Sequence, residues 1–261
     1  MSDNQVHIAR KDGLLIVTLA NPDSNRMNLA VFRGLGDALE EARKSETRAV
    51  LLRAQGPVFS LGADVHEMLS ASTEFALEAV KDYVDLIEAV EALSVPTIAA
   101  VHGVCSSGGL EFALAFDHLW AAAGTKIGFL EPLLAIIPLA GGVQRIASRV
   151  GRARAFEIAT AGALYTVETF EKWNIVNRVI AADSFNAEVE AFAGRLAAGP
   201  TKAYGAVKSV LRTWDKVGAT AADQTNLEMN RVVMASDDAT AAIKSFVENG
   251  PSRAPRVFAG T

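Results

Sequence analysis

The sequence has almost no cysteine: Cys105 is the single one among its 261 residues. One cysteine excludes an intramolecular disulfide framework and a zinc site built from several thiolates, and it favours a reducing compartment. Residues 1–13 are polar and charged, without the apolar stretch of a secretory signal, and no run of about 18 uninterrupted apolar residues occurs. We therefore expect a cytoplasmic protein that is neither exported nor membrane-spanning.

The chain also lacks clusters of basic residues. Its 25 Lys and Arg residues stand against 30 Asp and Glu residues, which gives a net charge of -5. A nucleic-acid-binding surface needs concentrated positive charge to neutralise phosphates. We therefore expect no nucleic-acid partner, and an anionic ligand would have to be held by local basic residues.

The remaining composition is that of a folded globular protein. Hydrophobic residues make up 50% of the chain and charged residues 21%, and we find no low-complexity segment or internal repeat. A chain of this length buries about three quarters of the surface that it exposes when unfolded. A full hydrophobic core is therefore available.

Strands and helices alternate along the first part of the sequence, which predicts an α/β fold. Residues 5–19 are typical of a hairpin, because the turn dipeptide Asp12-Gly13 separates two β-rich runs. Residues 75–93 carry apolar side chains at helical spacing with acidic residues between them, which predicts a helix. Further predicted elements are strands at 49–53, 97–104 and 119–123, and helices that begin at residue 109 and span 143–150.

Beyond about residue 184 the pattern is helical only, with predicted helices at 202–214 and 221–247. We therefore predict two parts, an α/β core at 1–183 and a helical C-terminal region at 184–261. The pattern changes gradually and without a linker. The sequence therefore does not imply that the two parts fold separately.

A first segment that could carry chemistry is residues 56–68, a loop that follows a predicted strand and opens a helix. Gly62 allows a positive φ angle or a close approach of the backbone. Asp64, with Glu67 three residues later, resembles a capping box. Two interpretations are open: a well-capped helix with no further role, or free N–H groups that accept negative charge at the helix N-terminus.

A second segment, residues 97–117, again runs from a strand through glycines into a helix. Gly103 and Gly108 have the spacing of a phosphate-binding P-loop, but Gly109 and Leu110 stand where Lys and Ser or Thr are required, so nucleotide hydrolysis is disfavoured. Glu111 follows in an otherwise apolar helix. A buried carboxylate costs several kcal/mol unless it is paired, protonated or used in function. Glu111 is therefore either a paired core residue or a functional group.

A third segment, residues 127–145, places Glu131 in another apolar run that includes Leu130, Leu133 and Leu134. A solvated loop glutamate is the simplest interpretation of such a residue. The apolar neighbours argue against a solvated position for Glu131. Glu131 is thus a second candidate for a functional carboxylate.

Taken together, the three segments resemble the crotonase, or enoyl-CoA hydratase/isomerase, superfamily over nearly the whole chain. The stretch F-S-x-G-A-D at 59–64 is similar to the first oxyanion-hole segment of that family, in which the N–H now on Ala63 points at the thioester oxygen. Gly108 matches the second donor, and Glu111 and Glu131 match the acid/base carboxylates of the hydratase branch. The resemblance implies a ββα spiral core, a helical trimerisation region, and a homotrimer or a dimer of trimers.

The resemblance also assigns residues to an acyl-CoA thioester substrate. Leu130 and Leu139 are expected to line the acyl pocket. Leu139 stands where the hydratases usually have glycine, so its side chain is expected to restrict the acyl end of the pocket. No metal and no cofactor other than the CoA of the substrate is implied. The residues expected to contact the CoA thioester are Leu61, Ala63, Asp64, Val65, His66 and Gly108.

The basic contacts to the CoA phosphates differ from the family pattern. His66 replaces a lysine that is often found just after the family's aspartate, and Asn249-Gly250 replaces a basic pair in the terminal segment. Arg26 and Arg256 are candidate substitutes. Solvated surface arginine is the alternative for each.

The resemblance implies hydration of a 2-enoyl-CoA. By analogy, Glu111 would help to position and activate water, and Glu131 would handle the proton at C2. A 3-enoyl-CoA isomerase is the nearest rival, and it needs one carboxylate to carry a proton between C2 and C4. A non-catalytic acyl-CoA-binding protein is a rival from another class. The presence of both glutamates favours the hydratase.

Overall fold

A six-stranded sheet is the centre of the computed structural model, which describes residues 5–22, 24–250 and 258–260. The strand order is β1-β2-β3-β4-β6-β9, and all neighbours except β1 and β2 are parallel. The predicted α/β class is therefore confirmed. The strands are β1 (Val6–Lys11), β2 (Leu14–Leu19), β3 (Ala49–Ala54), β4 (Thr97–Val101), β6 (His118–Ala122) and β9 (Arg178–Ile180).

The predicted N-terminal hairpin is confirmed. β1 and β2 pair in antiparallel register, with Lys11 opposite Leu14. The two turn residues, Asp12 and Gly13, have φ angles of 47° and 80°. Two positive φ angles are required by the tight turn whose twist matches that of the flanking strands, and Asp-Gly supplies them at little cost.

The single strand predicted at 97–104 is wrong, because the structure divides it between two sheets. β4 ends at Val101, and β5 (Val104–Ser106) joins a second, three-stranded sheet with β7 (Lys126–Gly128) and β8 (Leu164–Thr166). Gly103 makes the break with a φ of 63°, and a Cβ there would lie 2.0 Å from the Pro57 carbonyl oxygen. The close approach of the backbone to the 56–68 loop therefore requires glycine.

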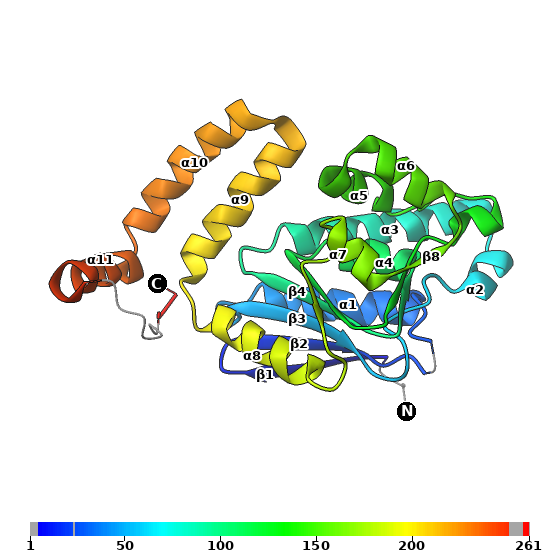
Figure 1. Ribbon diagram of the computed structural model, residues 1–261, viewed down its shortest axis with the longest axis horizontal. Coiled ribbons are helices and arrows are strands. Elements are labelled where there is room, and N and C mark those ends of the chain that lie inside the picture. Colours follow the sequence, from blue (N-terminus) through cyan, green and yellow to red (C-terminus); the bar gives the residue numbers. More distant parts are fainter. Residues whose placement is uncertain (1–4, 23, 251–257, 261) are drawn as a thin grey trace.

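Helices cover both faces of the large sheet (Figure 1). The helix α1 was not predicted, although Asn28 caps it and its apolar residues recur at helical spacing from Val31 to Ala42. The helices up to residue 197 are α1 (Leu29–Ala42), α2 (Val65–Ser70), α3 (Thr73–Glu91), α4 (Gly108–Ala113), α5 (Gly142–Val150), α6 (Arg152–Thr160), α7 (Val167–Lys172) and α8 (Phe185–Ala197), with a 3-10 turn, η1 (Glu131–Leu134).

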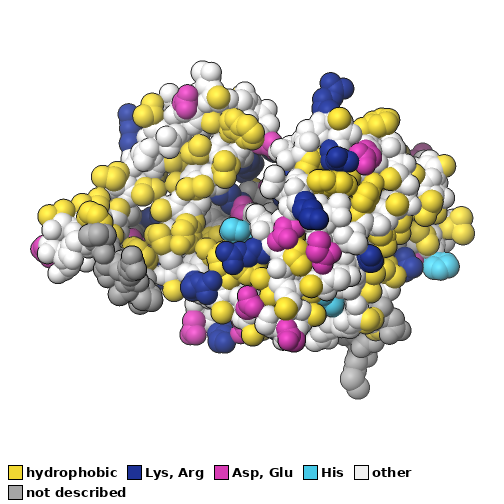
Figure 2. All heavy atoms as spheres, viewed as in Figure 1, with side chains coloured by type: hydrophobic (Ala, Val, Ile, Leu, Met, Phe, Trp, Pro, Cys, Tyr) yellow, Lys and Arg dark blue, Asp and Glu magenta, His cyan; other side chains and the backbone are white. Residues whose placement is uncertain are grey.

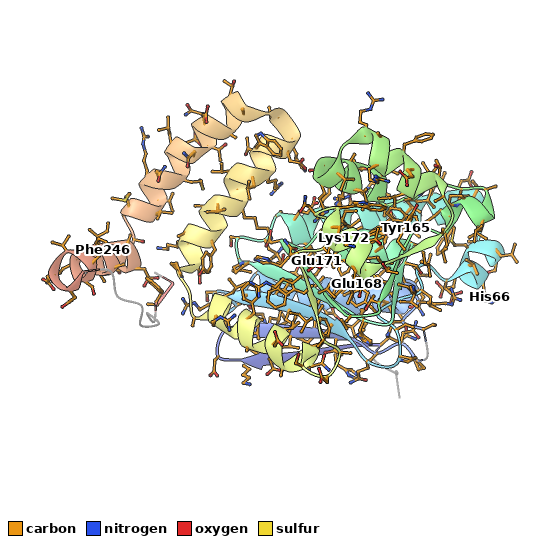
Figure 3. The ribbon with its side chains drawn as sticks, viewed as in Figure 1. His66, Tyr165, Glu168, Glu171, Lys172 and Phe246 are labelled. Atoms are coloured by element: carbon orange, nitrogen blue, oxygen red, sulfur yellow. The ribbon has the colours of Figure 1, made fainter. Side chains whose placement is uncertain are left out.

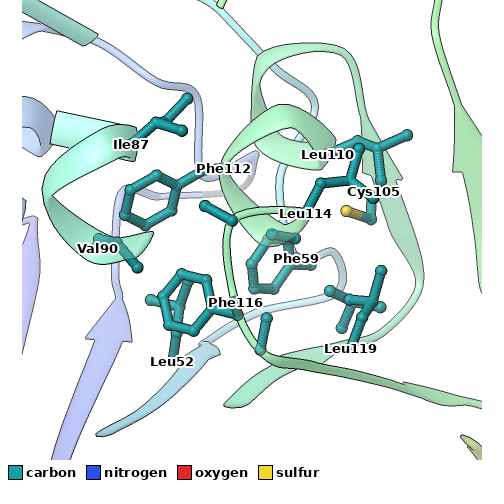
Figure 4. Close-up of a cluster of buried hydrophobic side chains, with 14 of the residues drawn as sticks. Leu52, Phe59, Ile87, Val90, Cys105, Leu110, Phe112, Leu114, Phe116 and Leu119 are labelled. Atoms are coloured by element: carbon teal, nitrogen blue, oxygen red, sulfur yellow. The ribbon is translucent and has the colours of Figure 1, made fainter. Parts of the chain in front are cut away.

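Two hydrophobic clusters lie on opposite sides of the sheet, because neighbouring residues of a strand face opposite ways. Leu15 and Val17 face the larger cluster with α1, α3 and α4, whereas Leu14 and Ile16 face α8. All six residues of α4 are buried. Figure 4 shows Leu110 and Phe112 of this helix among core side chains from α3, β3 and the loops around it. Glu111, the only glutamate of α4, is thus carried by a helix that is buried along its whole length.

The last three helices extend away from the sheet as a C-terminal arm (Figure 1). The arm consists of α9 (Thr201–Val217), α10 (Ala219–Met234) and α11 (Asp237–Asn249). The single helix predicted at 221–247 is wrong, because Ser236 interrupts it and its side chain caps α11. α8 packs on the sheet rather than in the arm, and the domain boundary at 183/184 stays a prediction. None of the described helices is long and apolar enough to cross a bilayer.

Candidate active site

A cavity of about 520 Å3 lies where the three segments singled out in the sequence meet. Arg26 from the loop before α1 also lines it. His66 does not: its side chain is exposed on α2, at the end of the molecule opposite Phe246 of α11 (Figure 3). Arg256 lies outside the described residues. The predicted site residues that line the cavity are Leu61, Ala63, Asp64, Val65, Gly108, Glu111, Leu130, Glu131 and Leu139.

The two predicted oxyanion donors come from loops that touch each other. Gly62 has a φ of 89°, and a Cβ there would lie 2.7 Å from the Ser107 Cβ and 3.3 Å from the Gly108 nitrogen. A Cβ on Gly108 would lie 3.6 Å from the Ala63 nitrogen. Within the described part of the chain, neither the Ala63 N–H nor the Gly108 N–H donates a hydrogen bond. Two unpaired donors therefore line the cavity side by side.

Glu111 reaches the cavity from α4 and is only 3% exposed. Its Oε1 atom accepts hydrogen bonds from the Ala140 and Gly142 N–H groups, each at 2.8 Å. A Cβ at Gly142 would lie 2.6 Å from the Phe129 ring and 3.0 Å from the Glu111 Cγ. The absence of a side chain at Gly142, the first residue of α5, thus lets the backbone approach this carboxylate closely enough to donate.

Burial raises the pKa of Glu111 to about 7. The hydrogen bonds from Gly142 and Ala140 and the nearby Arg145 charge lower this pKa, while the Glu131 charge raises it. Desolvation wins because the two N–H groups replace only part of the water that the carboxylate loses. A carboxyl group with a pKa near neutrality suits proton transfer, since both protonation states are accessible.

Glu131 begins η1 and is 6% exposed. Burial raises its pKa, and the hydrogen bonds that it accepts, one of them from Ser107, oppose this rise. The distance from the Ser107 Oγ to the Glu131 Oε2 is 3.0 Å. Among the described residues, neither Glu111 nor Glu131 forms a salt bridge, so Glu111 is paired by the Ala140 and Gly142 N–H groups rather than by a cation.

The capping interpretation of Asp64 is confirmed. Its carboxylate is the N-cap of α2 and accepts from the His66 N–H at 2.9 Å and the Glu67 N–H at 3.5 Å. In a full capping box Glu67 would also accept from the Asp64 N–H. The Glu67 carboxylate instead accepts from the Leu29 N–H at 3.4 Å. Asp64 therefore holds the end of the first loop in place.

Two supporting residues were missed by the sequence reasoning. The Tyr83 hydroxyl donates to the Gly108 carbonyl at 2.7 Å, and Arg145 forms a bidentate ion pair with Glu91 at 2.8 and 2.9 Å. Arg145 also donates to the Ala140 carbonyl, within the loop that holds Glu111. Tyr83 lies on the apolar stripe of α3, and a buried hydroxyl needs a partner. The sequence therefore indicated that the Tyr83 hydroxyl needs a hydrogen-bond partner, but it did not identify that partner, which lies 25 residues away.

Comparisons with known proteins point the same way. The sequence matches the enoyl-CoA hydratase/isomerase family over residues 9–253. It is 30% identical over 198 residues to EchA17 of Mycobacterium tuberculosis, named a probable enoyl-CoA hydratase, with 76% of each chain covered. It is 40% identical over 133 residues to the enoyl-CoA isomerase/hydratase fer4 of Mycosarcoma maydis, which covers 51% of this chain and 48% of that protein.

A solved structure is similar over nearly the full length. The enoyl-CoA hydratase from Bacillus anthracis superimposes with a TM-score of 0.91 at 25% identity, covering 98% of this chain and 100% of that chain. The crotonase-like core followed by a helical region, which the resemblance implied, is thereby confirmed.

The raised pKa of Glu111 predicts a pH-dependent cost to stability. The folded state keeps the proton up to about pH 7, whereas the unfolded state loses it near 4.5. The stability that the protonated Glu111 contributes is therefore fully present below pH 4.5 and is lost as the pH rises to about 7. Glu111→Gln removes the cost, so its unfolding free energy relative to wild type should rise by about 2 kcal/mol between pH 5 and pH 8.

Denaturant unfolding at both pH values and one protein concentration measures this difference. Glu88→Gln, on the exposed face of α3, is the matched control for the replacement of one glutamate by glutamine. If the difference in unfolding free energy between Glu111→Gln and wild type is the same at both pH values, the desolvated state of this carboxyl group is contradicted.

Proposed function

The chain belongs to the enoyl-CoA hydratase/isomerase family, and we propose that it adds water across the 2,3 double bond of an enoyl-CoA thioester. The observation that carries the proposal is the juxtaposition of two buried carboxylates and two unpaired backbone donors around one cavity. Hydration needs each of these groups. An isomerase needs only one of the carboxylates, and a binding protein needs neither as an acid or base.

The backbone donors would stabilise the charge that develops during the reaction. Attack of water on C3 of a conjugated thioester moves electron density onto the carbonyl oxygen and forms an enolate. We propose that the N–H groups of Ala63 and Gly108 donate hydrogen bonds to this oxygen. One preorganised donor of this kind is typically worth a factor of about 10² to 10³ in rate. The approach of Gly62 to residues 106–108 would fix the spacing of the two donors.

The two glutamates would then move the protons. We propose that Glu111 positions the water and takes a proton from it as the oxygen bonds to C3, and that Glu131 delivers a proton to C2. Both Ala140 and Gly142 donate to the Oε1 atom of Glu111, which leaves Oε2 for the water. Because the Glu131 charge raises the pKa of Glu111, the pair would titrate with pKa values that belong to both groups.

We propose that the acyl group and the CoA phosphates of the substrate contact different parts of the cavity wall. Leu130 and Leu139 would face the acyl group, and the half-exposed Leu139 would restrict its length or shape. Arg26, whose Nη1 atom lies 3.3 Å from the Ala63 carbonyl oxygen, is the cation we propose for the CoA phosphates. We propose that no cofactor is needed, and that the protein works in the cytoplasm, in keeping with its single buried thiol.

The isomerase remains the second candidate, because the matched fer4 protein carries both activities in its name. Double-bond migration moves a proton from C2 to C4 through one carboxylate and incorporates no water. The burial of a second carboxylate beside the first would then cost free energy without a catalytic return. This cost favours the hydratase.

We propose that the C-terminal arm joins copies of the chain into a homotrimer or a dimer of trimers. Neither α9 nor α11 contains a buried residue, and Figure 2 shows hydrophobic side chains along the arm. Such large exposed apolar surfaces are unusual on monomers. Sedimentation at micromolar concentration should give a trimer or hexamer, and a 27.6 kDa monomer alone would contradict the proposal. The exposed apolar residues of the arm are Val207, Leu211, Trp214, Val217, Leu227, Val232, Met234, Ile243, Phe246 and Val247.

Substitution of the two glutamates tests the proposed reaction. Glutamine keeps the size and hydrogen bonding of the side chain but cannot act as an acid or base near neutral pH. Glu111→Gln and Glu131→Gln should each lower kcat for hydration by about 10² to 10⁴ while acyl-CoA still binds. The double variant should be little worse than either single one, because linked groups are not additive.

Steady-state kinetics with an enoyl-CoA, together with calorimetric binding of the acyl-CoA, measure these effects, and Glu88→Gln again serves as the control. Near wild-type hydration by Glu111→Gln would rule out the proposed role of that residue. Double-bond migration that depends on Glu131 and survives Glu111→Gln would instead identify an isomerase.

A further inference from the structure

Ser107 has a backbone conformation that a non-glycine residue seldom adopts. Its φ is 53° and its ψ is -131°, which lies outside the left-handed helical region. Conformations of this kind cost free energy and persist only where the surroundings enforce them. Glycine would adopt the same angles without that cost. The presence of serine at this position therefore calls for a compensating contact.

That contact is not the one that serine usually makes at the start of a helix. Ser107 is the N-cap residue of α4, where a serine hydroxyl ordinarily accepts a hydrogen bond from a backbone N–H of the first turn. The structure shows no such capping bond from its side chain. The hydroxyl bonds instead to the segment that contains Glu131.

Three hydrogen bonds connect Ser107 to residues 128–131. The Ser107 N–H donates to the Gly128 carbonyl at 3.0 Å, the Leu130 N–H donates to the Ser107 Oγ at 3.2 Å, and that Oγ donates to the Glu131 Oε2 at 3.0 Å. Because the Leu130 N–H occupies an acceptor site of the oxygen, the hydroxyl hydrogen is directed at Glu131. Backbone and side chain together fix the direction of this donor.

We propose that Ser107 is the positioning residue of Glu131: its hydroxyl holds Oε2 and leaves Oε1 as the oxygen that exchanges a proton with substrate C2. The inference deepens the proposed function and rests on it. The next residue, Gly108, supplies a proposed oxyanion donor. One dipeptide would therefore set the place of the thioester oxygen and of the proton-transferring carboxylate relative to each other.

A purely structural role for Ser107 makes the opposite prediction for stability. The Ser107 Cβ lies against the first loop, where a Cβ at Gly62 would approach it to 2.7 Å. If the side chain served only to pack these loops, Ser107→Gly would lower the stability of the fold. If it serves to hold Glu131, the same substitution relieves the backbone strain and weakens catalysis.

Ser107→Gly and Ser107→Ala test the proposal in the full-length protein. Loss of a hydrogen bond to a charged group should lower kcat for hydration about 10- to 100-fold with KM nearly unchanged. The thermal midpoint of Ser107→Gly should equal or exceed that of wild type. Because the lost bond favours the ionised carboxylate, the limb of the pH-rate profile that belongs to Glu131 should move to higher pH in both variants.

Infrared titration of the Glu131 carboxyl band, isolated by subtracting the spectrum of Glu131→Gln in the same background, gives a readout that needs no turnover. This band should titrate at higher pH in Ser107→Gly than in wild type. Asn174→Gly is the control, because Asn174 is a non-glycine residue that shares a positive φ (59°) with Ser107 but is exposed, and its substitution should change neither kcat nor the titration.

The two proposals fail in different ways. If the wild-type protein hydrates no enoyl-CoA but the Glu131 band titrates at higher pH in Ser107→Gly than in wild type, the proposed function is overturned and the role of Ser107 is retained. If the Glu131 band titrates at the same pH in Ser107→Gly and in wild type, the positioning role of Ser107 is overturned. This holds if kcat is retained, and it holds if kcat and the thermal midpoint both fall.

Discussion

The desolvation of two carboxylates in one cavity is the constraint on which the rest of the site depends. Glu111 and Glu131 are 3% and 6% exposed, and burial is the largest influence on the pKa of each. Without polar partners, such groups would destabilise the fold by several kcal/mol. The partners are backbone N–H groups and one hydroxyl rather than cations. Neutral partners leave each carboxyl group able to take up and release a proton.

Those partners in turn require close approach between backbone segments. Gly142 can donate to Glu111 only because it has no Cβ to collide with the Phe129 ring, and Gly62 can meet Ser107 for the same reason. Arg145 joins the loop that holds Glu111 to the end of α3 through Glu91. α4 is buried along its whole length, so the Glu111 backbone has little freedom to move. Glu111 is thus carried by a fully buried helix, which suits a site that must preorganise its groups.

Much of this arrangement could be predicted from the sequence, because its signals are local. The hairpin follows from Asp12-Gly13, and the placement of Glu111 and Glu131 in apolar runs marked them as unusual carboxylates. The break at Gly103 was missed because a buried run of apolar residues does not reveal which sheet it joins. The roles of Ser107 and Arg145 could not be found either, since their partners lie 24 and 54 residues away and depend on the folded chain.

The most direct test of the central claim is to incubate the wild-type protein with a panel of 2-enoyl-CoA and 3-enoyl-CoA thioesters in H2(18)O and, separately, in D2O, and to identify the products by mass spectrometry. Hydration predicts a 3-hydroxyacyl-CoA that carries (18)O at C3 after incubation in H2(18)O and one deuterium at C2 after incubation in D2O. A product that has only a shifted double bond and no (18)O, or the absence of any 3-hydroxyacyl product across the panel, would contradict it.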